Sequence, residues 1–189
     1  VVVATGVSRP HRPAIPGFEL AEGYDTMSVD PADYLDQRVL VIGKGNSAFE
    51  TADALLETTT AIHVAGPESV RLAWRTHYVG HLRAVNNNFL DTYQLKSGNA
   101  VLDGRVERIE RDGDRLAVTF WFTRADETRV LHYDRVLACT GFAFDASVFD
   151  ATCRPALAID GRFPAQTDEW ESVDQPGLSS ERLRLAAVD

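Results

Sequence analysis

The stretch Val39-Leu40-Val41-Ile42-Gly43-Lys44-Gly45-Asn46-Ser47-Ala48 decides the fold of this chain. Its four leading apolar residues have the length of a buried strand, and a glycine turn follows directly. Ser47 and Glu50 stand in the register of a capping box, which predicts that a helix begins there. The expected helix has apolar residues at helical spacing, namely Phe49, Ala52, Leu55 and Leu56.

The flanking sequence extends this unit into a parallel sheet. Residues 61–65 predict a second strand, which ends at Gly66-Pro67. Strand, glycine turn, helix and strand in this order predict a βαβ unit of about thirty residues. Residues 135–139 predict a further apolar strand, followed by Thr140-Gly141. A short strand that ends at Thr5-Gly6 has the same pattern.

The remaining segments predict smaller elements around this sheet. The alternation of apolar and polar residues, with Asp112-Gly113 as a turn, predicts an antiparallel meander. Its three strands are expected over 105–111, 116–122 and 128–133. A helix is expected over 78–93, a helical turn over 31–35, an extended connection over 8–18 and a loop-rich tail from 151. The fold class is therefore α/β, a Rossmann-like three-layer domain with an antiparallel meander.

Composition excludes several classes of protein. The net charge of −9 argues against binding to a phosphate backbone, so no nucleic-acid partner is expected. No apolar run approaches the roughly 18 residues of a membrane span, and no secretory signal opens the sequence. Cys139 and Cys153 form neither a CxxC pair nor a metal site, and Cys139 is expected to be a buried, inert thiol. This cysteine usage favours a reducing cytoplasm.

The glycine turn has the residues expected of a phosphate-binding site. Gly43 permits a tight turn, Gly45 lets a pyrophosphate approach the backbone, and Ala48 lets helix and strand pack closely. Asn46 and Ser47 lie in the first helical turn, where N–H groups and the helix dipole favour phosphates. These residues predict a dinucleotide-binding site.

The choice of dinucleotide depends on the end of the second strand. An NAD site usually has an acidic residue there, whereas Ala65-Gly66-Pro67 has none and Glu68 only follows it. Arg71 and Arg75 could grip a 2′-phosphate and would share a face if the segment were helical. NADP is therefore favoured, with NAD as the alternative.

The motifs resemble the FAD-dependent pyridine-nucleotide oxidoreductases, a superfamily that includes flavin-containing monooxygenases. Ala4-Thr5-Gly6 and Cys139-Thr140-Gly141 match its two "ATG" motifs, and residues 43–52 match its nucleotide-binding turn. More closely, the chain is similar to the family of the endoplasmic-reticulum flavoprotein linked to protein degradation and its bacterial relatives. That similarity extends over 70–80, 82–87, 90–97 and 133–136.

The resemblance implies a division into domains. Residues 1–37 would end the first segment of a FAD domain, residues 38–138 would bind NAD(P), and residues 139–189 would return into the FAD domain. Thr5, Gly6, Thr140 and Gly141 would mark the crossings and contribute to cofactor binding. The expected partners are a dinucleotide and the missing remainder of the FAD domain. FAD's own N-terminal GxGxxG is absent, so the chain is expected to be a fragment that is inactive alone.

The resemblance also implies a reaction, in which hydride passes from NAD(P)H to FAD and electrons then pass to oxygen or another acceptor. No catalytic residue is assigned; His77, Tyr78 and residues 86–88 are candidates only. Two alternatives remain open. A dithiol-disulfide reductase would need a CxxC motif, and a non-catalytic nucleotide-binding or interaction module would keep the fold without flavin.

Overall fold

The computed structural model describes residues 2–3, 8–73, 81–96, 99–152, 154–157 and 184–185. The chain forms two compact units, one of residues 12–141 and the other of residues 1–11 and 142–189. Several expectations fall outside the described residues, namely those on Thr5, Gly6, Arg75, His77, Tyr78 and Cys153. No helix of the described residues is long and apolar enough to cross a membrane.

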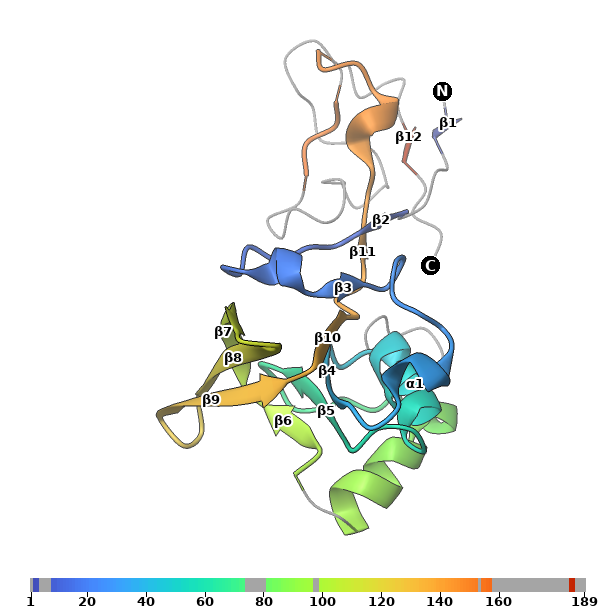
Figure 1. The fold of residues 1–189 in the computed structure, drawn as a ribbon. Coiled ribbons are helices and arrows are strands. Elements are labelled where there is room, and N and C mark those ends of the chain that lie inside the picture. The colour runs from blue at the N-terminus through green and yellow to red at the C-terminus, as the bar shows by residue number, and fades with distance from the viewer. Residues whose placement is uncertain are drawn as a thin grey trace. The chain divides into compact units, whose positions relative to one another are not determined.

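The unit of residues 12–141 is built on a sheet of five parallel strands (Figure 1). Its strand order is β3 (Glu22–Gly23), β10 (Arg135–Ala138), β4 (Arg38–Ile42), β5 (Ala61–Gly66) and β6 (Val101–Asp103). All neighbours are parallel, with Leu40 opposite His63 on one side and Val136 on the other. The central strands are continuous apolar runs because both faces of this parallel sheet are covered.

One face of the sheet packs against the helix α1 (Asn46–Leu55). Val39 and Val41 of β4 point to this side, where they meet Phe49 and Ala52. The apolar spacing that predicted the helix is also the spacing of its buried residues, Ala48, Phe49, Ala52 and Leu55. The short helix η2 (Pro31–Tyr34) adds the fully buried Tyr34 to this core, which confirms the predicted helical turn.

The opposite face packs against an antiparallel meander of β7 (Arg105–Asp112), β8 (Arg115–Phe122) and β9 (Glu127–Tyr133). Leu40 and Ile42 of β4 belong to the core on this side, with Val118 and Phe120 of β8. The helix η1 (Phe18–Leu20) joins it through Phe18. Helix, parallel sheet and meander are thus three layers, which confirms the predicted α/β fold with an antiparallel meander.

Two predicted helices begin or run differently in the structure. Helix α1 begins at Asn46 with Gly45 as its N-cap and makes no side-chain cap hydrogen bond, so the expected capping box of Ser47 and Glu50 is wrong. Glu50 instead accepts hydrogen bonds from Arg83 (3.3 Å) and Asn86 (2.8 Å). Those partners lie far along the chain, and tertiary contacts of this kind override a local motif.

The helix expected over 78–93 is only partly present. Residues 81–83 are not helical, η3 (Ala84–Asn86) is a single short turn, and η4 (Leu90–Lys96) is a π-helix. Phe89 anchors this segment, because its ring packs against those of Phe49 and Tyr93. The ring centroids lie 5.9 Å and 5.5 Å apart, respectively. Residues 78–80 lie outside the described part of the chain.

The other unit contains short elements. β1 (Val2–Val3) pairs in parallel with β12 (Arg184–Leu185), and β2 (Arg9–Pro10) pairs antiparallel with β11 (Phe142–Ala143). The helix η5 (Ala146–Val148) is capped by Asp145, whose carboxylate accepts a hydrogen bond from the Ser147 N–H at 2.9 Å.

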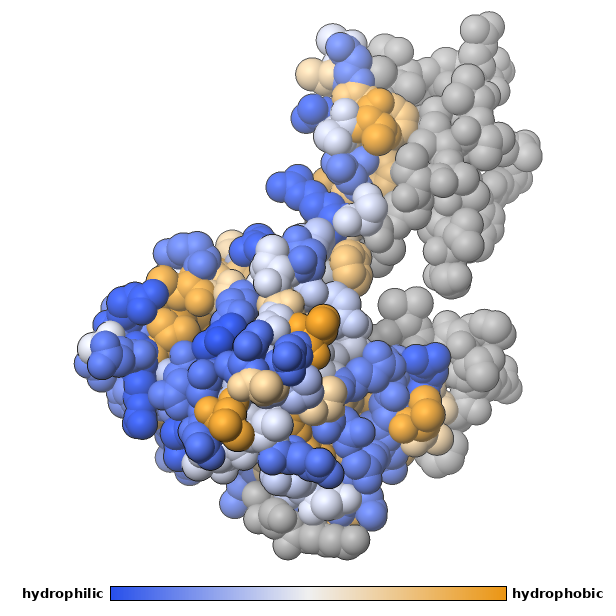
Figure 2. Space-filling view, turned by 45° about the vertical axis from the view of Figure 1, so that its right-hand side comes forward, coloured by the Kyte–Doolittle hydropathy of each residue, from blue (hydrophilic) through white to orange (hydrophobic). Residues whose placement is uncertain are grey.

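On the face shown in Figure 2, the apolar residues that are drawn in colour form small separate groups among hydrophilic ones.

Candidate dinucleotide-binding site

The site begins where β4 ends, at a turn that requires glycine. Gly43 has a φ of +133°, and a Cβ placed there would lie 2.2 Å from the carbonyl oxygen of Cys139. The Gly43 N–H also donates to the Ala65 carbonyl at 2.8 Å. Backbone from β4, β5 and the end of β10 therefore approaches so closely that no side chain fits at Gly43.

Gly45 is different, because its surroundings are open. Its φ of −86° and ψ of −177° are available to any residue, and it is the N-cap of α1. Apart from Gly45 itself and its two chain neighbours, no atom of the described chain lies within 4 Å of a Cβ built at Gly45. The first N–H groups of a helix have no partner within the helix, and Gly45 stands at that end of α1. An anion can approach the backbone at this point.

Ala48 and Asn46 tie the helix to its surroundings. Ala48 is fully buried in the core between helix and sheet, as its small size predicted. The Asn46 amide donates to the His81 carbonyl (3.0 Å) and accepts from the Arg83 N–H and the Asn86 side chain (both 2.9 Å). The Asn46 side chain therefore anchors the loop from residue 81 onward. Ser47 follows it in the first helical turn and is half-buried.

Lys44 lies between the two glycines and carries a contact that the sequence did not reveal. Its ammonium group donates to Asp103 Oδ1 at 2.5 Å and to the Glu68 carbonyl at 2.6 Å. Its side chain is only 10% exposed, because its stem lies over Gly66 at the end of β5. Lys44 thus connects the carboxyl ends of β4, β5 and β6, where ligands bind in open α/β sheets.

Burial and pairing shift the pKa values of this ion pair. Burial lowers the pKa of Lys44, and the contact with Asp103 opposes that change. Burial alone would raise the pKa of Asp103, but the hydrogen bonds from Lys44 and Ser69 outweigh it, so the pKa of Asp103 is lowered. Asp103 is therefore a carboxylate at neutral pH. Neither Lys44 nor Asp103 was expected in the site; Asp103 follows two apolar residues whose run is too short to predict a strand.

Arg71 follows β5 but does not lie on a helix. Residues 71–73 are extended: Leu72 forms a β-bridge with Leu82, and the Leu82 N–H donates to the Arg71 carbonyl at 2.7 Å. The condition under which Arg71 and Arg75 would share a helical face therefore does not hold at Arg71. Its guanidinium pairs with Glu68 at 2.5 Å, and both side chains are well exposed, 63% and 68%.

The end of β10 lies beneath the turn. The Cys139 N–H donates to the Ile42 carbonyl at 2.8 Å, and Gly141 has a φ of +81°. Cys139 is buried as expected, and burial raises the pKa of its thiol to about 11. Thr140 and Gly141 close the unit that holds the turn. Among the described residues, no group of His, Cys, Asp or Glu side chains is arranged to hold a metal ion.

Sequence comparison places the chain among known proteins. Residues 1–179 match the family described as pyridine nucleotide-disulphide oxidoreductase. FAD-dependent oxidoreductase domain-containing protein 2 of Danio rerio is 37% identical over 223 residues, which are 94% of this chain and 32% of that protein. Its counterpart in Mus musculus is 38% identical over 201 residues, 94% of this chain and 30% of that protein. The chain thus spans about a third of the length of these relatives.

Comparison of structures supports the same fold. The bacillithiol disulfide reductase Bdr of Staphylococcus aureus superimposes with a TM-score of 0.69 at 19% identity. The match covers 98% of this chain and 52% of that protein.

Proposed function

This chain belongs to the pyridine nucleotide-disulphide oxidoreductase family, and we propose that it binds a nicotinamide dinucleotide for hydride transfer to FAD in a larger oxidoreductase. The relatives named above are called FAD-dependent, and the match covers 32% and 30% of their length. Residues 38–138 would hold the nicotinamide dinucleotide, while residues 1–37 and 139–189, with Thr5, Gly6, Thr140 and Gly141, would belong to a FAD domain.

One observation carries the proposal: the backbone at Gly45 is open, while the backbone at Gly43 is closed. A turn that served packing alone would have no need of a glycine at position 45, where the conformation suits any residue. The open space lies at the amino end of α1, where the helix favours an anion. A pyrophosphate has the charge and the size to occupy it.

The chain's own residues then have separate roles. Gly43 shapes the turn, and the N–H groups that follow Gly45 bind the pyrophosphate. Lys44 holds the ends of three strands together through Asp103 and the Glu68 carbonyl. When bound, the nicotinamide supplies a hydride that the flavin accepts.

We further propose NADPH as the preferred dinucleotide. The end of β5, Ala65-Gly66-Pro67, has no carboxylate to accept a ribose 2′-hydroxyl. Arg71 follows on an exposed loop, and a guanidinium binds a phosphate with charge-assisted hydrogen bonds. Electron transfer onward to oxygen, as in a monooxygenase, and a cytoplasmic setting belong to the same proposal; the free thiol of Cys139 suits a reducing compartment.

Calorimetric titration with NADPH and NADH tests the proposal. Gly45→Val should fold normally, because valine accepts the backbone angles of Gly45 and its Cβ would meet no described atom beyond the two chain neighbours. Its side chain would fill the space that the pyrophosphate needs, so affinity for both dinucleotides should fall at least about tenfold.

Gly45→Ala serves as a graded control, since its single methyl group should cost less affinity than valine. Unchanged affinity in a folded Gly45→Val protein would remove the turn from the binding site. A wild-type protein that binds neither dinucleotide would favour the alternative of an interaction module that keeps only the fold.

A further inference from the structure

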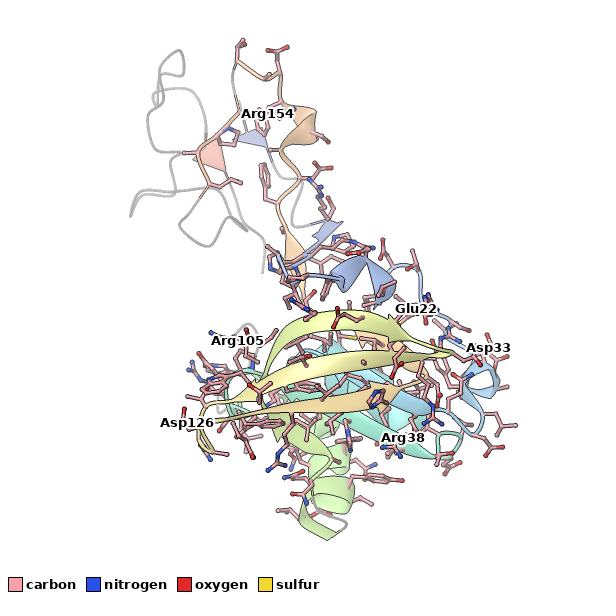
Figure 3. The ribbon with its side chains drawn as sticks, turned by 60° about the vertical axis from the view of Figure 1, so that its left-hand side comes forward. Glu22, Asp33, Arg38, Arg105, Asp126 and Arg154 are labelled. Carbon is pink, nitrogen blue, oxygen red and sulfur yellow. The ribbon has the colours of Figure 1, made fainter. Side chains whose placement is uncertain are left out.

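Arg124 lies in the turn between β8 and β9, yet its side chain contacts the loop after β5. Its guanidinium donates to Ser69 Oγ at 3.0 Å and lies 3.9 Å from Asp103 Oδ2. In Figure 3, Asp126 of the same turn and Arg105 mark one end of the meander, while Glu22 and Asp33 lie at the other end. The meander therefore brings Arg124 to the carboxyl ends of the parallel strands.

A chain of hydrogen bonds fixes Arg124 there. Lys44 donates to Asp103 Oδ1, and Asp103 Oδ2 accepts from Ser69 Oγ at 2.8 Å. Ser69 Oγ in turn accepts from Arg124. The half-buried pair of Lys44 and Asp103 thus positions an arginine whose own side chain is 82% exposed.

The side chains that hydrogen bonds and ion pairs link to Lys44 differ in charge from the whole molecule. Three cationic side chains, Lys44, Arg71 and Arg124, meet two carboxylates, Glu68 and Asp103. Three minus two leaves an excess of one positive charge, whereas the chain as a whole carries −9. A local basic site in an acidic protein favours an anionic ligand.

The donors match one chemical group in particular. A guanidinium has five N–H donors, and the hydrogen bond to Ser69 uses one of those of Arg124. Arg71 is likewise exposed and pairs with Glu68 through one nitrogen. Arg71 pairs with Glu68, and Arg124 donates to Ser69. Both partners follow directly after the place where the adenosine ribose of a dinucleotide is expected. A phosphomonoester has the charge and the three acceptor oxygens to bind two such forks.

We propose that Arg124 is a specificity-determining residue that binds the 2′-phosphate of NADPH together with Arg71. This inference rests on the proposed function and adds a residue from the meander, outside the βαβ unit. Lys44, Asp103 and Ser69 are positioning residues for it. The meander then contributes to cofactor choice as well as covering the sheet.

Calorimetric titration of Arg124→Ala with NADPH and with NADH tests the inference. Affinity for NADPH should fall by roughly ten- to a hundredfold, while affinity for NADH should stay unchanged. Arg124→Lys should recover part of the loss, since it restores the charge without the fork. Arg108→Ala is the matched control, because Arg108 is an exposed arginine of the same meander, paired with Glu110, and should leave both affinities unchanged.

The outcomes separate this inference from the proposed function. Equal losses for NADPH and NADH, no loss for NADPH, or a wild-type protein that binds NADPH no more tightly than NADH would each overturn the role of Arg124. Those results would leave dinucleotide binding at the Gly45 turn intact. Failure of the wild-type protein to bind either dinucleotide would instead overturn the proposed function.

Discussion

Gly43 and Gly45 are two residues apart and serve opposite purposes. Gly43 is closed in by Cys139, whereas a Cβ at Gly45 meets none of the described residues beyond its chain neighbours. A sequence motif cannot distinguish the two, because both positions are simply glycine. The backbone angles can: a φ of +133° at Gly43 admits glycine only, while Gly45 is in an ordinary extended conformation.

This difference predicts opposite results from one substitution. Gly43→Ala should lower the free energy of unfolding by at least about 1–3 kcal/mol, because alanine would be strained at this φ and its Cβ would meet the Cys139 carbonyl. Gly45→Ala should leave stability within about 0.5 kcal/mol. Denaturant unfolding of both variants measures this. Equal stability of the two would mean that the turn is not closed at Gly43.

Lys44 shows why the site was incompletely predicted at the residue scale. The residue between the glycines of the motif is unrestricted, so nothing in the sequence marks it. Its partner Asp103 lies 59 positions later, on a three-residue strand with no clear pattern. Arg124 is equally hidden, since only the meander brings it to Ser69. Contacts of this kind depend on tertiary structure.

At the scale of elements, the long strands were predictable, whereas the short strands β3 and β6 and the helix ends were not. β4, β5 and the meander strands carry long apolar or alternating patterns that packing on a sheet demands. The start of α1 was mispredicted because Glu50 accepts hydrogen bonds from the distant residues Arg83 and Asn86 instead of forming a local capping box. Residues 84–96 contain asparagine and aromatic residues that favour several turn types, and they form a 3-10 turn and a π-helix.

The contact between β5 and β9 predicts a pH dependence of stability. His63 Nδ1 lies 2.8 Å from the Tyr133 hydroxyl, and their rings meet edge to face. Burial, with the nearby charge of Arg38, lowers the pKa of His63. As pH falls below about 6.5, the unfolded chain binds a proton at this histidine before the folded chain does. Stability from His63 is therefore complete above that pH and is lost as pH falls toward the folded pKa.

Denaturant unfolding at several pH values between about 5 and 7 measures this effect. The wild-type free energy of unfolding should rise with pH, with a contribution from His63 of up to about 1.4 kcal/mol per pH unit. His63→Gln keeps a hydrogen-bonding side chain without a titrating group, so its profile should be flatter. His132→Gln is the control, because His132 is more exposed and pairs with Asp112 on the meander. Identical slopes for wild type and His63→Gln would contradict the assignment.

At the scale of the whole molecule, the sequence predicted the fold of the unit of residues 12–141, but the role of the proposed FAD domain rests on the relatives. The unit of residues 12–141 contains every described element of the three-layer fold and the complete Gly43–Ala48 turn. Its fold was predictable because β4, β5 and β10 are apolar runs, while α1 and the meander strands follow a hydrophobic period. The proposed FAD domain rests on the family and on longer relatives, of which the match covers about a third. The division at residues 37 and 138 stays a prediction of domain roles.

The central claim is that the Gly45 turn holds the dinucleotide from which the flavin is reduced. The most direct measurement is anaerobic mixing of NADPH with the FAD-loaded full-length protein that contains this chain, while the flavin absorbance is followed. The wild-type flavin should bleach. A Gly45→Val protein that retains the same amount of FAD should bleach at least about tenfold more slowly at a subsaturating NADPH concentration, because its turn no longer admits the pyrophosphate. Bleaching of both proteins at the same rate would contradict the account.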